Sequence, residues 1–173
     1  NKNKEKDLEL NDQFLFVVFV TKKDDKYYVL TKTDYDESNK TFYQQTIEDF
    51  EFELPNIKIE NSKKIDDISK KIAKDIFSKD LKDEYKSIVY SNIVKGKFEE
   101  IDVYGKKQNE WWKEKDYFAL YILKEKYDCA YGYKWLALNV APRRIRLHNQ
   151  NKGLKYIKEN ILGWNKNLTL YNL

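Results

Sequence analysis

The arginines near the C-terminal end are the residues whose type and spacing are best suited to chemistry. The chain has 33 lysines and arginines, yet arginine occurs only at Arg143, Arg144 and Arg146. A guanidinium group binds phosphate or carboxylate through a planar fork, which the lysine ammonium lacks. With Lys152 and Lys155 nearby, the segment is predicted to contact an RNA backbone or an acidic partner. The alternative is a solvated loop that holds one structural salt bridge.

A pair of tryptophans is the second unusual feature. Trp111 and Trp112 lie side by side in a polar stretch. Adjacent residues of a strand or an extended loop face different ways, so at least one indole is predicted to be poorly covered and to contact a partner. The alternative is that both rings fold back over a sheet edge.

The remaining reactive residue types are few. One Cys and one His exclude an intrachain disulfide and any zinc site built from several such ligands. His148 has no Ser or Cys partner at an interpretable spacing, and no motif that lowers a thiol pKa surrounds Cys129. The acid pairs Asp66–Asp67 and Glu99–Glu100 are neighbours in sequence only. We therefore expect no catalytic residue, no cofactor and no metal ligand.

The composition limits the class of protein. With 173 residues, the chain is long enough for one domain with a real core. An aromatic content of 16% argues against disorder despite 36% charged residues. The net charge of +4 permits a polyanionic partner without requiring one. The longest apolar run, residues 14–20, is too short to span a membrane, so no membrane contact is expected.

The hydrophobic pattern predicts an α/β fold. Isoleucines at helical spacing predict one helix after residue 61, and a second is predicted over residues 151–162. Runs and alternations of apolar residues predict strands over residues 14–20, 27–33, 42–54, 87–105, 116–125 and 131–138. A mixed sheet packed between helices follows from this order. We expect a polar arm at 1–12, one domain at 13–163 and a tail at 164–173.

Three segments give the chain a resemblance to a known family. They are "FELP" at 52–55, "KIENSKKIDDISKKIAKDIF" at 58–77 and "YGYKWLALNVAPRR" at 131–144. Together they resemble the Nudix fold, whose hydrolases act on nucleoside diphosphates linked to another group. The resemblance runs over residues 14–162 and implies a Nudix-like α/β/α sandwich.

The family's metal-binding motif is degraded in this chain. Its glutamates lie one helical turn apart and bind Mg²⁺ through oxygen. We align Ile57 with the second glycine of the motif. The first glutamate of the motif is then replaced by Lys63, its Arg-Glu pair by Lys71–Ile72, and its Glu-Glu pair by Asp75–Ile76. A shift of one residue changes the matches but leaves at most one carboxylate, that of Asp75.

We interpret this helix as a scaffold. One acid among Lys70, Lys71 and Lys74 is neutralised by those cations and is expected to be a solvated surface charge. The resemblance therefore implies a protein that is not an enzyme.

Among non-catalytic Nudix-fold proteins, the chain is most similar to the Nudix-fold protein found in the large subunit of the mitochondrial ribosome. The Leu-Pro turn without paired glycines, the helix without glutamates and "YKWLALN" before the last helix carry this similarity. It implies a structural role in translation, mitochondrial localisation, and contact with neighbouring large-subunit proteins of the central protuberance and with rRNA. A leader before Asn1 is expected.

Two alternatives stay open. The first is a divergent Nudix hydrolase of a nucleoside diphosphate derivative, with metal ligands recruited from Glu48, Asp49, Glu51 or Glu53. The second is a free regulatory module that binds RNA or a nucleotide without turnover.

Overall fold

The protein is represented by a computed structural model that describes residues 14–34, 51–58, 65–82, 85–92, 97–101 and 115–162. Its strands are β1 (Phe14–Lys23), β2 (Lys26–Thr33), β3 (Phe52–Glu53), β4 (Asn56–Lys58), β5 (Tyr85–Asn92), β6 (Lys97–Ile101), β7 (Lys115–Leu123) and β8 (Tyr133–Ala137). Its helices are α2 (Ile65–Phe77), α3 (Ala141–Arg144), α4 (His148–Ile157) and the π-helical segment η4 (Lys158–Leu162).

The strands form one mixed sheet. Its order is β3-β2-β1-β7-β5-β6, with β4 paired to β1 and β8 paired to β2. The central strands β1 and β7 run parallel, from the pair Leu15 and Tyr117 to the pair Thr21 and Leu123. The other strand pairs are antiparallel. The predicted mixed sheet is thus confirmed.

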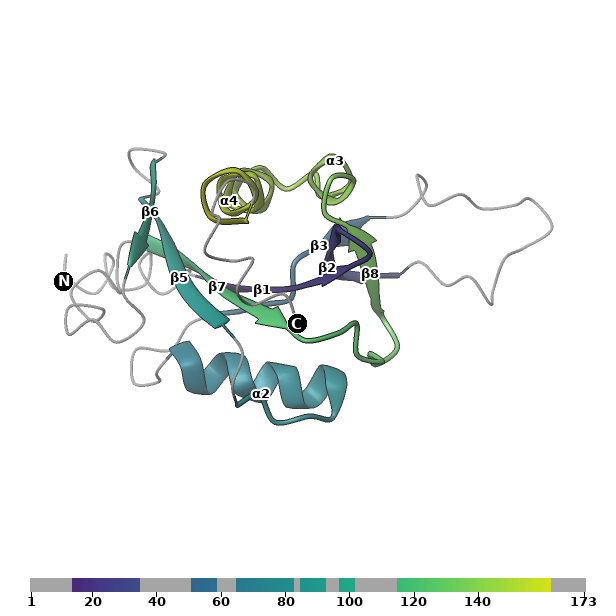
Figure 1. The fold of residues 1–173 in the computed structure, drawn as a ribbon. Helices are drawn as coiled ribbons and strands as arrows, with labels where there is room; N and C mark the ends of the chain where they lie inside the picture. Colours follow the sequence, from purple (N-terminus) through teal and green to yellow (C-terminus); the bar gives the residue numbers. More distant parts are fainter. Residues whose placement is uncertain are drawn as a thin grey trace.

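Helices cover both faces of this sheet (Figure 1). On β1, Leu15, Val17 and Phe19 belong to the apolar cluster that includes α2. Phe16, Val18 and Val20 alternate with them and belong to the cluster that includes α3 and α4. A strand that lies between two helical layers must be apolar on both faces, which explains why the apolar run of β1 is continuous. The fold is therefore an α/β/α sandwich with a mixed sheet between helices, as predicted.

The two helical layers follow from their apolar stripes. In α2, Ile65, Ile68 and Ile76 are buried against the sheet, as the spacing predicted, and Ile72 is partly buried there. In the other layer, Leu154 and Ile157 of α4 are fully buried. Helix α4 begins at His148, earlier than predicted, and passes into η4.

The contact between α4 and the sheet is very close at Gly153. A Cβ atom added there would lie 2.3 Å from the ring of Phe118 on β7. Glycine is therefore required by the close approach of the helix to that ring, because any side chain would overlap it. This contact determines which face of α4 points away from the sheet.

Some predicted boundaries differ from the structure. The arginine-rich segment was expected to be a loop, but its first half is the short helix α3, which Pro142 favours by occupying the first turn. Of the predicted strand 42–54, the structure describes only β3, and residues 35–50 lie outside the described part. The predicted stretch 87–105 contains β6 and all but the first two residues of β5, which begins at Tyr85. Strand β4 was not predicted.

Among the described residues, no helix has the length and apolar character of a membrane span.

Candidate functional site

A row of polar side chains crosses three strands on the sheet face that α2 covers. Lys32 of β2 lies in register with Glu53 of β3 on one edge and with Tyr133 of β8 on the other. Residues in register on adjacent strands project to the same face. Tyr133 packs against the apolar cluster of α2, which identifies the face. Glu53 and Tyr133 are half-buried and Lys32 is exposed, so solvent reaches this polar row.

The turn after β3 holds Glu53 in place. The Asn56 side-chain amide donates to Glu53 Oε1 at 2.6 Å and to the Leu54 carbonyl at 2.7 Å. The buried Leu54 N–H donates to Gln150 Oε1 of α4 at 2.7 Å. The Pro55 carbonyl accepts a hydrogen bond from Val17 N–H at 2.8 Å. These bonds anchor the "FELP" turn to β1 and α4, so the backbone that carries Glu53 is fixed.

The stretch that replaces the family's paired glycines is regular strand. Asn56 and Ile57 belong to β4 and pair with Phe16 and Leu15 of β1. The non-glycine residues with positive φ in the described part are Asp24, Asp25 and Ser78, so neither β4 residue needs a glycine. The missing glycines are therefore accommodated by an extended backbone.

Asp75 of α2 brings a second carboxylate toward the polar row. Burial raises the pKa of Tyr133, and the negative charges of Asp75 and Glu53 raise that pKa further. The two acids lie 22 positions apart in sequence, yet the charges of both raise the pKa of this one phenol. Tyr133 is therefore a neutral hydrogen-bond donor at physiological pH.

The loop before β8 positions Tyr133 against α2. Ala130 N–H donates to the Ile76 carbonyl at the end of α2, at 2.9 Å. Thr33 N–H donates to the Gly132 carbonyl at 2.8 Å. Gly132 has a φ of +93°, a backbone conformation that favours glycine. The end of α2 is thus tied to the strand pair that carries Lys32 and Tyr133.

Two lysines of α2 pair with acids other than Asp75, which the sequence did not predict. Lys70 pairs with Asp66 at 3.2 Å, and Lys74 pairs with Asp80 at 3.6 Å. Two of the three cations expected to neutralise Asp75 therefore lie next to other carboxylates. Asp75 is exposed, as predicted. Its charge is more available than the sequence indicated, although exposed ion pairs of this kind are weak.

The described acids offer only part of a metal site. No group of three or more Asp, Glu, His or Cys residues in the described ranges could hold a metal ion. Mg²⁺ in phosphate-processing sites is often bound by one or two carboxylates together with substrate phosphates. Glu53 and Asp75, the two acids that raise the pKa of Tyr133, are the carboxylates available for such a donor set near the polar row. Of the other predicted ligands, Glu51 is exposed, whereas Glu48 and Asp49 lie outside the described residues.

An aromatic group lies on the same sheet face as the polar row. Trp135, two positions after Tyr133, stacks on Phe77 at the end of α2 with ring centroids 5.8 Å apart. The Trp135 indole donates to the Tyr127 carbonyl at 3.0 Å. Lys79 lies 4.8 Å from the centroid of the Tyr127 ring. These partly buried rings were not singled out from the sequence, although the alternation of β8 contained the signal.

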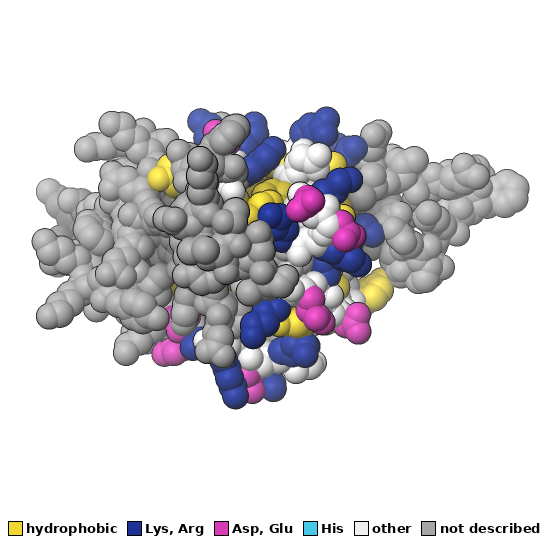
Figure 2. All heavy atoms as spheres, in the orientation of Figure 1, with side chains coloured by type: hydrophobic (Ala, Val, Ile, Leu, Met, Phe, Trp, Pro, Cys, Tyr) yellow, Lys and Arg dark blue, Asp and Glu magenta, His cyan; other side chains and the backbone are white. Residues whose placement is uncertain are grey.

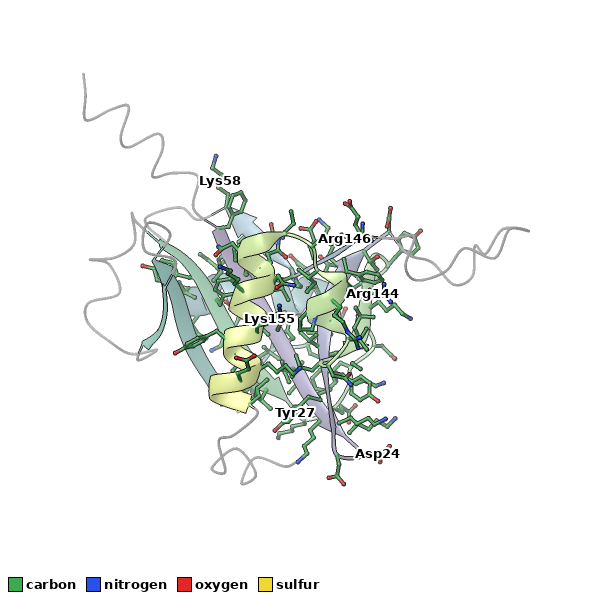
Figure 3. The ribbon with its side chains drawn as sticks, turned by 90° about the horizontal axis from the view of Figure 1, so that it is seen from above. Asp24, Tyr27, Lys58, Arg144, Arg146 and Lys155 are labelled. Atoms are coloured by element: carbon green, nitrogen blue, oxygen red, sulfur yellow. The ribbon has the colours of Figure 1, made fainter. Side chains whose placement is uncertain are left out.

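The residues predicted to contact RNA or a partner lie on the opposite face of the sheet. Arg143 and Arg144 are on α3, Arg146 follows Ile145, and Lys152 and Lys155 are on α4. Figure 3 shows Arg144, Arg146 and Lys155 on this side of the molecule. The structure thus brings the five cations of the prediction to one layer. Trp111 and Trp112 lie outside the described residues, as do the arm at 1–12 and the tail at 164–173.

The cysteine and the Asp66–Asp67 acid pair make contacts that indicate structural roles. The Cys129 thiol donates to the Tyr133 carbonyl at 3.5 Å, and burial and the Asp128 charge raise its pKa. A thiol of this kind is a weak nucleophile. The Tyr121 hydroxyl donates to Asp66 Oδ1 at 2.6 Å, which gives one member of the acid pair a structural partner. His148 is the first residue of α4.

A hollow of about 260 Å³ lies away from the polar row. It opens between the β1–β2 turn, the end of β8 and η4, and its lining includes Asp25, Tyr27, Asn139, Lys158 and Leu162. Figure 3 shows Tyr27 and Asp24 at this end of the molecule. The lining is mainly apolar and brings together no pair of carboxylates. We therefore place the candidate site at the polar row, where the charges of two acids act on Tyr133.

No protein-family model matches the chain, and no curated protein matches it. Solved structures do match it. The Caenorhabditis elegans Ap4A hydrolase is 11% identical over 84% of this chain and 95% of its own, with a TM-score of 0.46. The E. coli dihydroneopterin triphosphate pyrophosphohydrolase is 10% identical over 83% and 92%, with a TM-score of 0.49. The NUDIX domain of Shewanella oneidensis NrtR, complexed with ADP ribose, is 13% identical over 85% and 86%, with a TM-score of 0.48.

These matches correct one prediction. The chain was expected not to be an enzyme, whereas the solved structures that it resembles include hydrolases by name. The prediction counted only the carboxylates of one helix. Carboxylates from two different elements, Glu53 of β3 and Asp75 of α2, both raise the pKa of Tyr133, so the acids near the polar row are not limited to that helix. The three structures share a fold with this chain, and none of their names is that of a ribosomal protein.

Proposed function

We propose that the protein is a divergent Nudix-type hydrolase that cleaves a phosphoanhydride bond in a nucleoside diphosphate derivative. One observation carries the proposal: Lys32 lies in register between Glu53 and Tyr133, and the negative charges of Glu53 and Asp75 both raise the pKa of Tyr133. Both acids lie within segments that resemble the family's motif, one in the "FELP" strand and one in the helix that follows.

Each residue of the polar row has a task in this proposal. Lys32, between Glu53 and Tyr133, offers a positive charge to a phosphate oxygen. Tyr133, kept protonated by burial and by the two acids, donates a hydrogen bond to another phosphate oxygen. Glu53 and Asp75 are the groups that would hold a divalent ion, and one of them would accept the proton of the attacking water. A bound divalent ion would neutralise the charge of the diphosphate.

The nucleoside part of the substrate is assigned to the aromatic group. Tyr127 and Trp135 are partly buried beside the end of α2, on the same sheet face as the polar row. Stacking on aromatic rings binds nucleobases with little preference among them. A nucleoside diphosphate linked to another group fits this combination of cation, acids and rings.

The test is Mg²⁺-dependent hydrolysis by the purified full chain. The substrates are diadenosine tetraphosphate, ADP-ribose, dihydroneopterin triphosphate and nucleoside diphosphate sugars, and released phosphate or nucleotide is measured. The double variant Glu53→Gln/Asp75→Asn should lose about 100-fold or more in kcat/KM. The matched control Glu125→Gln/Asp128→Asn removes two exposed acids outside the polar row and should retain activity. Absence of turnover on the whole panel, or equal activity of both double variants, contradicts the proposal.

Two predictions made from the resemblance stay predictions. They are mitochondrial localisation and contact with large-subunit ribosomal proteins and rRNA. Sedimentation of native extract through a sucrose gradient at moderate salt tests them independently of the hydrolysis assay. Comigration with the mitochondrial large subunit would support the predicted contacts, and recovery only at the top of the gradient would contradict them.

A further inference from the structure

The layer formed by α3, α4 and η4 has a strongly unbalanced charge. Residues 141–162 contain six Lys and Arg residues and one acid, Glu159. We call the six cations the basic face: Arg143, Arg144, Arg146, Lys152, Lys155 and Lys158. In Figure 2, dark blue side chains follow the upper edge of the molecule, where Figure 1 places α3 and α4. The partner of such a surface must carry several negative charges.

The packing of α4 turns its lysines outward. Gly153 touches the Phe118 ring, and Gln150, Leu154 and Ile157 are buried against the sheet. Lys152 and Lys155 are exposed. The orientation of the lysines is thus set by the core and not by a partner.

The backbone that carries the arginines is also fixed. The Asn151 side-chain amide of α4 donates to the Pro142 carbonyl, and to the Ile145 carbonyl at 2.9 Å. Ile145 is fully buried and forms a bridge with Phe52 of β3. The exposed Arg143 and Arg146 therefore start from backbone positions that are held on α4 and on the sheet. A prearranged set of cations loses less conformational entropy on binding than a mobile one.

We propose that the basic face binds the phosphate backbone of a single-stranded nucleic acid. A guanidinium group binds a phosphate through two parallel N–H···O hydrogen bonds, and the lysines add positive charge along α4. Helix α4 has ten residues and is about 15 Å long, which matches a few nucleotides. Leu147, with 54% of its surface exposed, lies between the arginines and α4 and offers an apolar contact to an unstacked base.

This surface is separate from the candidate hydrolase site. The basic face and the polar row of Glu53, Lys32 and Tyr133 lie on opposite sides of the sheet. The proposal therefore does not depend on hydrolysis, and a variant of the basic face should keep whatever activity the polar row has.

The test compares two triple charge reversals of equal size. Arg143→Glu/Arg146→Glu/Lys155→Glu changes the basic face, and Lys23→Glu/Lys71→Glu/Lys124→Glu changes three exposed lysines elsewhere. The probe is a labelled single-stranded RNA of about 12 nucleotides, and its anisotropy is measured at several salt concentrations. The basic-face variant should bind at least about tenfold more weakly at low salt. Its slope of log K against log salt should fall by about 2, since about 0.7 is lost for each phosphate contact.

Circular dichroism and urea unfolding should show that both triple variants are folded. Equal RNA affinity of the two triple variants would overturn the proposal, as would absence of RNA binding by the wild-type chain. Tighter binding of a poly-glutamate peptide than of RNA, lost in the basic-face variant, would assign the face to an acidic protein and overturn it too.

Discussion

The two helical layers of this protein handle charge in opposite ways. Helix α2 has three Asp and three Lys residues within Ile65–Phe77, and Lys70 and Lys74 pair with nearby acids. The α3–α4 layer has six cations and one acid. Helix α2 is balanced in charge, and two of its lysines lie beside acids other than Asp75, whereas the α3–α4 layer carries an excess of positive charge. The difference shows that the number of lysines in a layer does not decide its charge balance, which depends on the acids beside them.

The largest expected effect is on the layer with the unbalanced charge. Gly153→Leu places a side chain in the volume occupied by the Phe118 ring, because even a Cβ would lie 2.3 Å from it. We expect the free energy of unfolding in urea to fall by about 3 kcal/mol and RNA binding to weaken. Lys152→Ala, a substitution of the exposed neighbour, is the control and should change stability little. Equal stability of the two variants would show that α4 does not need this close contact.

A smaller effect is expected where the two layers are connected. Gln150→Met removes the acceptor for the Leu54 N–H, which then remains buried without that partner. We expect a loss of about 2 kcal/mol in the free energy of unfolding. Because this bond anchors the "FELP" turn that carries Glu53, any hydrolysis should also slow down. Asn139→Ala, at an exposed position, serves as the control. If Gln150→Met slowed hydrolysis without lowering the free energy of unfolding, the bond between Gln150 and Leu54 would not act only by holding the structure together.

The smallest effect concerns α2 and depends on pH. Tyr121→Phe removes the hydroxyl that donates to Asp66 and should cost about 1 kcal/mol at neutral pH. Burial, followed by the Asp66 hydrogen bond, raises the pKa of Tyr121 above its ordinary value of about 10. Above that pH the unfolded chain ionises this phenol and the folded chain does not, so the folded state binds more protons. Stability from the neutral phenol is therefore complete below about pH 10 and is lost as the pH rises further.

Urea unfolding at neutral pH and above pH 10 measures this difference. The stability advantage of the wild type over Tyr121→Phe should shrink at the higher pH. Tyr131→Phe changes a side chain that is 82% exposed and should have little effect on unfolding at neutral pH. An advantage of the wild type that grows with pH would contradict the sign of this shift.

Much of the fold was predictable from local patterns. The apolar run of β1 and the isoleucine spacing of α2 predicted both elements, because burial on two faces and burial on one stripe impose different periods. The short elements β4 and α3 were missed. Three or four residues are too few to show a period, and β4 exists only through its pairing with β1.

The candidate site was predictable only in part. The arginine cluster was visible as a composition bias, and its placement with Lys152 and Lys155 on one layer was expected from their nearness in sequence. The joint effect of Glu53 and Asp75 on the pKa of Tyr133 was not predicted, since these residues come from a strand, a helix and a later strand. The prediction that the chain is not an enzyme considered the acids of a single helix, and it is contradicted by the hydrolases among the solved structures that the chain resembles.

The sequence by itself determined the helical stripes, the apolar strands and the excess of positive charge at residues 141–162, because these depend on which residues are neighbours along the chain. The tertiary structure decided which carboxylates act on Tyr133, which lysines lie beside other acids, and which way the cations of α4 point. Those outcomes depend on strand register and on the close contact at Gly153, which bring together residues from distant parts of the chain.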